Sequence, residues 1–299
     1  MTVQMVPLLV PQPTRPASCG VHTLVTLGDS TPVGLGDPLP GGGWRGFPAL
    51  LGVALGAPVL VNPSRTGARM ACVRREQLPV ALTAVSTGGP AVVVLFVGMN
   101  DTLRSDFEPA LLHVEFAATV QALRAAGAHV LMVRFHDHTR VFRIPGPLRR
   151  ALARRIVALN AVIDAVAATD PRGVGMLDLH TLPGGYDRDA WAVDRLHPSE
   201  RGHRLLAGGF AALLEGAGFA VLSPVSLDCA GGREVRAAHR AAWLVVKGLP
   251  WLVRRGRDLG PVIARGMVDG MRRPDARPRP SLQRSEEPPD PLQGLLEQR

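Results

Sequence analysis

The chain has 299 residues, which allows one large domain or two smaller ones, and its hydrophobic share of 46% is normal for a globular core. A formal net charge of +9 invites a nucleic-acid or anionic-membrane interpretation, but the arginines are spread along the whole chain. Because only 4% of the residues are aromatic, the chain offers no stacking platform for single-stranded nucleic acid, and we expect no nucleic-acid partner.

Cysteine usage and the first residues of the chain bear on the cellular compartment. Cys19, Cys72 and Cys229 are far apart, odd in number and form no C-x-x-C pair, which argues against a disulfide framework and a zinc site. Reduced thiols are the default in the cytosol, so we expect a cytoplasmic protein. Residues 1–19 are rich in proline, and no basic residue precedes their short apolar stretch. We interpret them as an extended N-terminal arm rather than a signal peptide or a membrane span.

Strand-like and helix-like segments alternate through residues 20–220. The expected strands are residues 24–27, 58–62, 91–97, 129–135 and 175–179. The expected helices are residues 43–55, 68–86 with an interruption near Pro79, 107–126, 148–168 and 198–216. Because residues 91–97 are apolar throughout, they suit a central parallel strand buried on both faces. The alternation predicts an α/β fold, a three-layer, flavodoxin-like α/β/α sandwich around a five-stranded parallel sheet.

The pattern changes after residue 220. We expect residues 221–271 to form a C-terminal helical appendage, with helices at 234–247 and 251–271, and the proline- and charge-rich residues 272–299 to form a disordered tail. The second helix places its apolar residues on one face and most of its arginines elsewhere, so it can lie on an anionic membrane or pack against protein. We favour packing on the domain or on a second subunit over peripheral membrane contact, and the oligomeric state stays open.

Four short polar motifs lie at the boundaries of these elements. Gly28-Asp29-Ser30 follows the first strand, at the sheet edge where ligands bind in open α/β folds. A serine there can present its hydroxyl to a substrate while its backbone N–H helps to bind an oxyanion, although a turn or helix-cap serine fits the tripeptide equally well. The other three motifs are Asn-Pro-Ser-Arg-Thr-Gly at residues 62–67, Gly-Met-Asn-Asp at 98–101 and Asp-Arg-Leu-His-Pro at 194–198.

The four motifs, in this order, resemble the SGNH subgroup of the GDSL esterase/lipase family. The resemblance extends from the glycine at 28 to the histidine at 203, which we interpret as structural. It implies that Ser30 is the nucleophile, that His197 acts as general base and then as general acid, and that Asp194 orients the imidazole. It also implies three oxyanion donors, the backbone N–H groups of Ser30 and Gly67 and the side-chain amide of Asn100.

Elementary chemistry agrees with these roles. A spacing of three residues in a loop can bring the Asp194 carboxylate beside the His197 imidazole. Glycine lets the backbone N–H of Gly67 approach a reacting carbonyl closely, although Pro63, in the same motif, can shift that group. The Asn100 amide is a neutral donor that can meet developing negative charge. Alternatively, this asparagine and glycine are ordinary turn residues, and residues 194–197 simply lead into the next helix.

Two further positions are expected near the substrate. Asp29 is interpreted as a carboxylate that supports the loop, and it is also a candidate substrate-binding residue together with His136. His136, Asp137 and His138 follow a predicted strand, and two histidines around an aspartate raise the question of a metal. No third or fourth ligand is evident, so we expect no metal and no cofactor.

The function implied by the resemblance is that of a serine esterase or acylhydrolase, which cleaves carboxylic esters through an acyl-enzyme. Because no insertion large enough for a lipase lid is obvious, small or medium acyl esters, including O-acetyl groups, are the expected small-molecule substrates. The same triad could instead serve an acyltransferase, in which an alcohol replaces water. A non-catalytic binding module on this fold is the second alternative.

Overall fold

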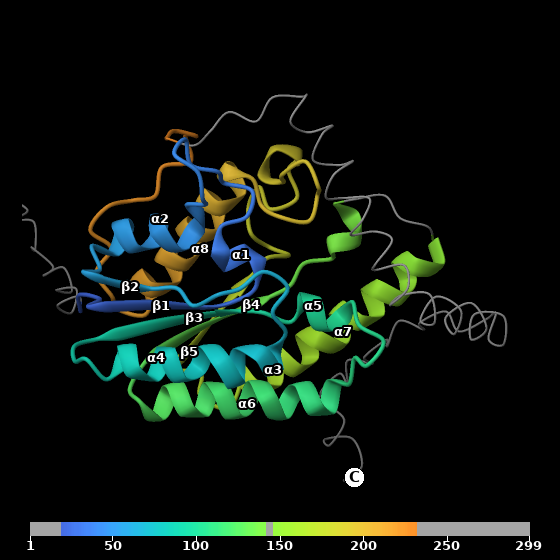
Figure 1. Ribbon diagram of the computed structural model, residues 1–299, viewed down its shortest axis with the longest axis horizontal. Helices are drawn as coiled ribbons and strands as arrows, with labels where there is room; N and C mark the ends of the chain where they lie inside the picture. The colour runs from blue at the N-terminus through green and yellow to red at the C-terminus, as the bar shows by residue number, and fades with distance from the viewer. Residues whose placement is uncertain (1–18, 142–145, 232–299) are drawn as a thin grey trace, which may run out of the picture.

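The computed structural model describes residues 19–141 and 146–231 (Figure 1). Residues 1–18 of the expected N-terminal arm lie outside this range. The two expected helices of the appendage and the expected tail also lie outside the described residues. Residues 221–231, the first part of the expected appendage, are described and form no regular helix or strand. Just before them, Phe219 forms a single parallel bridge with Cys19.

A single sheet of five parallel strands, in the order β2-β1-β3-β4-β5, forms the centre of the described structure. The strands are β1 (Thr23–Gly28), β2 (Val59–Val61), β3 (Ala91–Phe96), β4 (His129–Arg134) and β5 (Val174–Asp178). Strands β1 and β3 pair over their full lengths and are buried at every residue, as expected for the centre of a parallel sheet covered on both faces. The predicted α/β fold around a five-stranded parallel sheet is therefore confirmed, and its strand order is that of flavodoxin.

Helices cover both faces of the sheet (Figure 1). Helices α2 (Gly46–Leu55) and α8 (Glu200–Gly216) pack together on one face, and α4 (Leu78–Val85), α6 (Pro109–Ala125) and α7 (Gly146–Ala167) lie on the other. Shorter helical segments are α1 (Ser30–Val33), α3 (Met70–Cys72), α5 (Met99–Thr102) and the 3-10 turns η2 (His138–Arg140) and η3 (Arg188–Ala190). Within the described ranges, no helix has both the length and the apolar character needed to cross a bilayer.

Aromatic side chains join the sheet to the helices on the α2 and α8 face. The Phe47 ring of α2 lies 5.9 Å from that of Phe96 at the end of β3 and 5.3 Å from that of Phe210 on α8. Phe47 and Phe210 are fully buried. Each buried aromatic ring removes a large apolar area from water, so this contact fixes α8, and the loop that precedes it, against the sheet.

The interruption expected near Pro79 occurs earlier in the chain. Helix α3 runs into a π-helical stretch, η1 (Val73–Gln77), and α4 begins at Leu78 with Pro79 in its first turn. The Leu78 N–H bonds to the carbonyl of Val73, five residues back. In a regular helix, the ring of Pro79 would clash with the carbonyl four residues earlier. Because the π turn is wider, Pro79 instead lies in the first turn of α4, where proline is tolerated.

The π turn also places a side chain on the strand that leads to the serine motif. Gln77 is buried, its amide nitrogen donates to the Gly28 carbonyl at 2.9 Å, and its amide oxygen accepts from the Gly28 N–H at 2.8 Å. Gly28 has a φ of +152°, and a Cβ there would lie 2.0 Å from the Phe96 carbonyl oxygen. Only glycine therefore allows β1 to end this close to β3.

Candidate active site

Ser30 lies at the point where the strand order reverses. Strand β2 lies on one side of β1 and β3 on the other, and the chain turns into α1 directly after β1. Asp29 caps α1, because its carboxylate accepts from the Thr31 N–H at 3.1 Å. Ligands bind in doubly wound sheets at this crevice outside the carboxyl ends of the strands. The Ser30 side chain is partly exposed, so it is positioned to contact a ligand bound there.

A continuous hydrogen-bond chain joins Ser30 to the loop before α8. The Nε2 atom of His197 lies 2.9 Å from Ser30 Oγ, and its Nδ1 atom lies 2.7 Å from Asp194 Oδ2. With the proton on Nδ1 held by the carboxylate, Nε2 is free of hydrogen and can accept the serine proton. The structure thus brings together three residues from sequence positions 30, 194 and 197, in the geometry of a nucleophile, a base and an orienting carboxylate.

The carboxylate of Asp194 is held by its own loop. Its Oδ1 atom accepts from the backbone N–H groups of Leu196 and His197 at 2.9 and 3.0 Å. Burial alone would raise the pKa of Asp194, but the hydrogen bond and charge of His197, with these backbone donors, hold the pKa below its ordinary value. Asp194 therefore stays ionised at neutral pH and can stabilise an imidazolium.

Asn100 lies on α5, which follows β3, and its amide nitrogen is 3.1 Å from Asp29 Oδ2 and 3.1 Å from the Ala68 carbonyl oxygen. Gly67, directly before Ala68, has a φ of +79° and open space where a Cβ would stand. The loop that carries Gly67 is tied to the end of β1 by a hydrogen bond from the Arg65 N–H to the Gly28 carbonyl. Gly67, in a turn, and Asn100, on α5, thus both lie at the edge that carries Ser30, and their oxyanion roles stay a prediction.

Asp29 is a buried carboxylate, only 4% exposed. Burial raises the pKa of Asp29 from 3.8 to about 6, and the charge of Asp101 adds to this effect, whereas Thr31, His197 and Asn100 oppose it. Asp29 contacts the Thr31 N–H and the Asn100 amide, as expected of a carboxylate that supports the loop. Its role in substrate binding stays a prediction.

The raised pKa of Asp29 makes the stability of the fold depend on pH. Because the folded-state pKa lies above the ordinary value, the stability contribution of Asp29 is complete below pH 4 and is lost as the pH rises through about 6. We expect wild type to lose up to about 3 kcal/mol of unfolding free energy relative to Asp29→Asn between pH 4 and pH 7. Urea unfolding of both proteins at four pH values measures this difference. A difference that does not vary with pH would contradict the raised pKa.

His136 and His138 follow β4 and lie in an aromatic cluster. The two rings contact Trp191 with centroid separations of 5.0 and 4.9 Å, and Tyr186 meets His136 edge to face at 5.4 Å. His136 is 4% exposed, and its expected place in the substrate pocket stays a prediction. Within residues 19–141 and 146–231, no group of three or more histidine, cysteine or acidic side chains is arranged to hold a metal ion.

The motifs did not point to several residues that support the site. Gln77 holds the end of β1, Trp191 packs against both histidines, and Tyr186 packs against His136. A buried Asp37 carboxylate binds Arg45, which also binds Glu200 in the first turn of α8. The only signal in the sequence was the presence of polar or aromatic residues inside otherwise ordinary segments, and this does not reveal their partners.

His203 is fully buried, with both ring nitrogens bonded to backbone groups of Phe47 and Leu35, in agreement with its structural interpretation.

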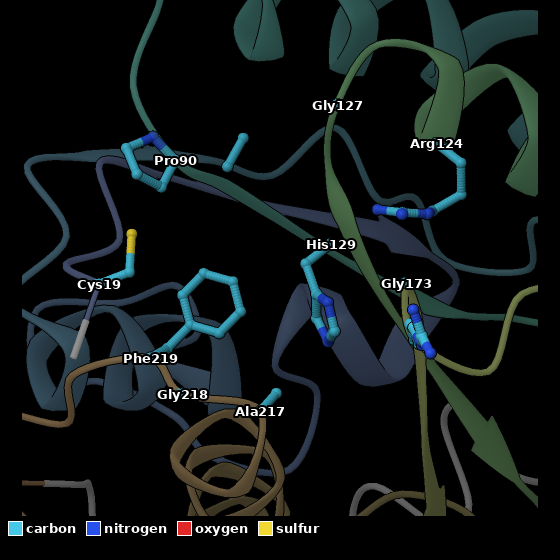
Figure 2. Close-up of a pocket in the computed structure, with 11 residues that line it drawn as sticks. Cys19, Pro90, Arg124, Gly127, His129, Gly173, Ala217, Gly218 and Phe219 are labelled. Carbon is cyan, nitrogen blue, oxygen red and sulfur yellow. The ribbon is translucent and has the colours of Figure 1, made fainter. Parts of the chain in front are cut away.

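A cavity of about 290 Å³ lies at the other end of the sheet (Figure 2). Its lining includes Ala91 and His129, the first residues of β3 and β4, together with Phe219 and Arg124. These are the amino ends of the strands, whereas Ser30 follows the carboxyl end of β1. The cavity is therefore separate from the edge that carries the Ser30–His197–Asp194 chain.

Comparisons with known proteins place the chain in a family. Searching curated proteins with the sequence finds no significant match. Among solved structures, the chain is similar to TesA, at 26% identity and a TM-score of 0.48, covering 65% of this chain and 99% of that one. It is also similar to the lipase/acylhydrolase from Enterococcus faecalis, at 20% identity and a TM-score of 0.49, covering 66% of this chain and 96% of that one. A further similar structure is phospholipase A1 from Streptomyces albidoflavus NA297, at 18% identity and a TM-score of 0.48, covering 66% of this chain and 99% of that one. The model of the GDSL-like Lipase/Acylhydrolase family matches residues 26–205, more than half of the sequence, and the chain belongs to this family.

Proposed function

We propose that the protein is a serine hydrolase that cleaves carboxylic esters through an acyl-enzyme on Ser30. The observation that carries this proposal is the hydrogen-bond chain from Asp194 through His197 to Ser30 Oγ, at the carboxyl edge of the sheet. Membership of the GDSL-like family supports ester hydrolysis as the reaction class. A non-catalytic binding module would have no need of an imidazole held between a carboxylate and a partly exposed hydroxyl.

In the proposed reaction, Ser30 Oγ attacks the ester carbonyl while His197 Nε2 takes its proton. Asp194 stabilises the imidazolium that forms, and His197 then gives the proton to the leaving alcohol as the carbon–oxygen bond breaks. Water, activated by the same imidazole, attacks the acyl-enzyme and releases the acid. An alcohol in place of water would give acyl transfer by the same steps.

Developing charge on the carbonyl oxygen needs hydrogen-bond donors. The proposed donors are the backbone N–H groups of Ser30 and Gly67 and the amide of Asn100. The Asn100 amide nitrogen lies within hydrogen-bond distance of Asp29 and of the Ala68 carbonyl, and it carries two N–H groups. One of these bonds must therefore be exchanged for the bond to the substrate oxygen as the transition state forms.

A series of nitrophenyl esters of increasing acyl length tests the proposed substrate class. We expect kcat/KM to be highest for acetyl to medium chains and to fall for long ones. Product analysis with and without added alcohols separates hydrolysis from acyl transfer, because only transfer yields a new ester. Fluorophosphonate labelling of wild type, with Ser30→Ala as control, identifies the nucleophile. Labelling that persists in the Ser30→Ala variant would exclude this mechanism.

A further inference from the structure

The loop that follows the proposed nucleophile lies directly against the loop that carries the proposed base. We call residues 34–37, which come directly after α1, the nucleophile loop. Gly36 in this loop has a φ of +102°, and a Cβ there would lie 1.9 Å from the carbonyl oxygen of Pro198, the residue after His197. Because only glycine permits this approach, the two loops touch without a side chain between them. Whatever holds them together also sets the distance from Ser30 to His197.

A buried ion pair holds the end of the nucleophile loop. Asp37 is fully buried, and its two carboxylate oxygens accept from Arg45 Nε at 2.9 Å and from Arg45 Nη2 at 3.0 Å. The Gly46 N–H, at the start of α2, donates to the same carboxylate at 3.2 Å. Two parallel bonds between a guanidinium and a carboxylate fix the plane of the guanidinium. The remaining N–H groups of Arg45 therefore point in a defined direction.

Glu200, the first residue of α8, lies in that direction. Its Oε1 atom accepts from Arg45 Nη2 at 2.7 Å, and from Nη2 of Arg204, one turn along the helix, at 3.1 Å. The Glu200 and Arg45 side chains are only 19% and 16% exposed, so water screens their attraction less than that of a surface pair. The side chains of Asp37, Arg45 and Glu200 thus form a bridge from the nucleophile loop to the helix that begins three residues after His197.

A single peptide group beyond α8 completes the cluster. The Ala230 N–H donates to Glu200 Oε1 at 2.7 Å, and the Ala230 carbonyl accepts from Arg45 Nη1 at 2.7 Å and from Arg204 Nη2 at 2.8 Å. Ala230 lies beyond residues 26–205, which the family model matches. Because the N–H holds the carboxylate and the carbonyl holds both guanidinium groups, this peptide keeps Glu200 turned towards Arg45.

We propose that Glu200 is a positioning residue for the triad: through Arg45 and Asp37, its carboxylate holds the start of α8, and the His197 loop before it, against the nucleophile loop. Glu200 acts through these contacts and not on the substrate. The proposal rests on the proposed ester hydrolysis for its kinetic consequence. Its structural consequence, the contact between His197 and Ser30, does not need a substrate.

Two substitutions of similar length separate packing from hydrogen bonding. Glu200→Met fills the same space without an acceptor, and Glu200→Gln keeps an oxygen that can accept from Arg45. Because small errors in position cost large factors in rate, we expect kcat for a nitrophenyl ester to fall at least about 10-fold in Glu200→Met, with KM unchanged within about twofold. Glu200→Gln should keep kcat within about threefold of wild type.

Glu115→Met is the matched control. The Glu115 side chain on α6 is also 19% exposed and also binds an arginine, Arg74 of η1, at 3.1 Å. This pair lies on the face of the sheet opposite to α2 and α8 (Figure 1). The control should therefore lose an ion pair of similar burial and leave kcat and KM unchanged.

A spectroscopic readout keeps the test independent of ester hydrolysis. In protein labelled with ¹⁵N-histidine, the Nε2 resonance of His197 is identified by its absence in His197→Gln. Ser30→Ala removes the hydroxyl 2.9 Å from this nitrogen, so we expect it to shift the resonance in the wild-type and Glu200→Gln backgrounds. In Glu200→Met, where the contact is already loosened, adding Ser30→Ala should shift the resonance little. If no ester is hydrolysed but the resonance behaves in this way, the proposed function fails and the positioning role stands.

Wild-type kcat together with a wild-type response to Ser30→Ala in folded Glu200→Met would overturn the proposal. Equal losses of kcat in the Met and Gln variants, or an equal loss in Glu115→Met, would overturn it as well. Melting temperatures establish that each variant is folded. Should Glu200→Met fail to fold, Glu200→Asp replaces it, because its shorter carboxylate keeps the charge but cannot bond Arg45 and Ala230 together. The same losses are then expected, and wild-type values would overturn the role.

Discussion

Replacing Ser30 with alanine is expected to lower kcat for ester hydrolysis by at least about 10⁴-fold while leaving the melting temperature within a few degrees of wild type. Ser30 Oγ is the atom that forms the acyl bond in the proposed reaction, and its side chain is partly exposed rather than part of the core. His197→Ala should cost a similar factor, because the hydroxyl then has no base at 2.9 Å. Initial rates with nitrophenyl acetate and thermal unfolding measure both effects.

The double variant distinguishes a triad from two independent contributions. Residues that act as one unit are strongly non-additive, so Ser30→Ala combined with His197→Ala should be no slower than either single variant. Ser105→Ala, an exposed serine away from the hydrogen-bond chain, serves as the control and should retain full activity. Activity of the Ser30→Ala variant within tenfold of wild type would rule out Ser30 as the nucleophile.

Replacing Asn100 with alanine is expected to lower kcat by about 10²- to 10³-fold, the usual effect of removing one oxyanion donor. Because the bond to the substrate oxygen would form only as charge develops, KM should change little. The variant also removes the contacts to Asp29 and the Ala68 carbonyl, so we expect a loss of about 1–3 kcal/mol in unfolding free energy. Steady-state kinetics and urea unfolding measure the two losses separately.

The two losses carry different information. If Asn100 donates to the oxyanion, kcat of Asn100→Ala falls even at temperatures where the variant is fully folded. A purely structural Asn100, which only ties α5 to Asp29 and Ala68, predicts the loss of stability with kcat near that of wild type. The second pattern would remove Asn100 from the proposed oxyanion donors and leave the Ser30 nucleophile untouched.

The strands and the motifs at their ends were predicted from the sequence because their signals are local. Residues 91–97 are apolar without interruption, and strand β3 (Ala91–Phe96) is buried at every position. The alternation of strands and helices then left few topologies, since parallel strands need right-handed crossovers. The interruption in the 68–86 helix was predicted too late in the chain. Pro79 shows that a regular helix cannot continue through it, but it does not show which turn of the helix changes to accommodate it. The structure puts the change at Val73–Gln77.

The sequence by itself determined the α/β class, the order of the four motifs and the candidates Ser30, Asp194 and His197, because each depends on residues close together in the chain or on a family pattern. Only the tertiary structure decided which side chains hold these residues in place. Gln77 on Gly28 and Asn100 on Asp29 join segments 49 and 71 residues apart. Such contacts depend on how helices and loops pack around the sheet, and a buried polar residue shows only that it needs a partner, not which partner it finds.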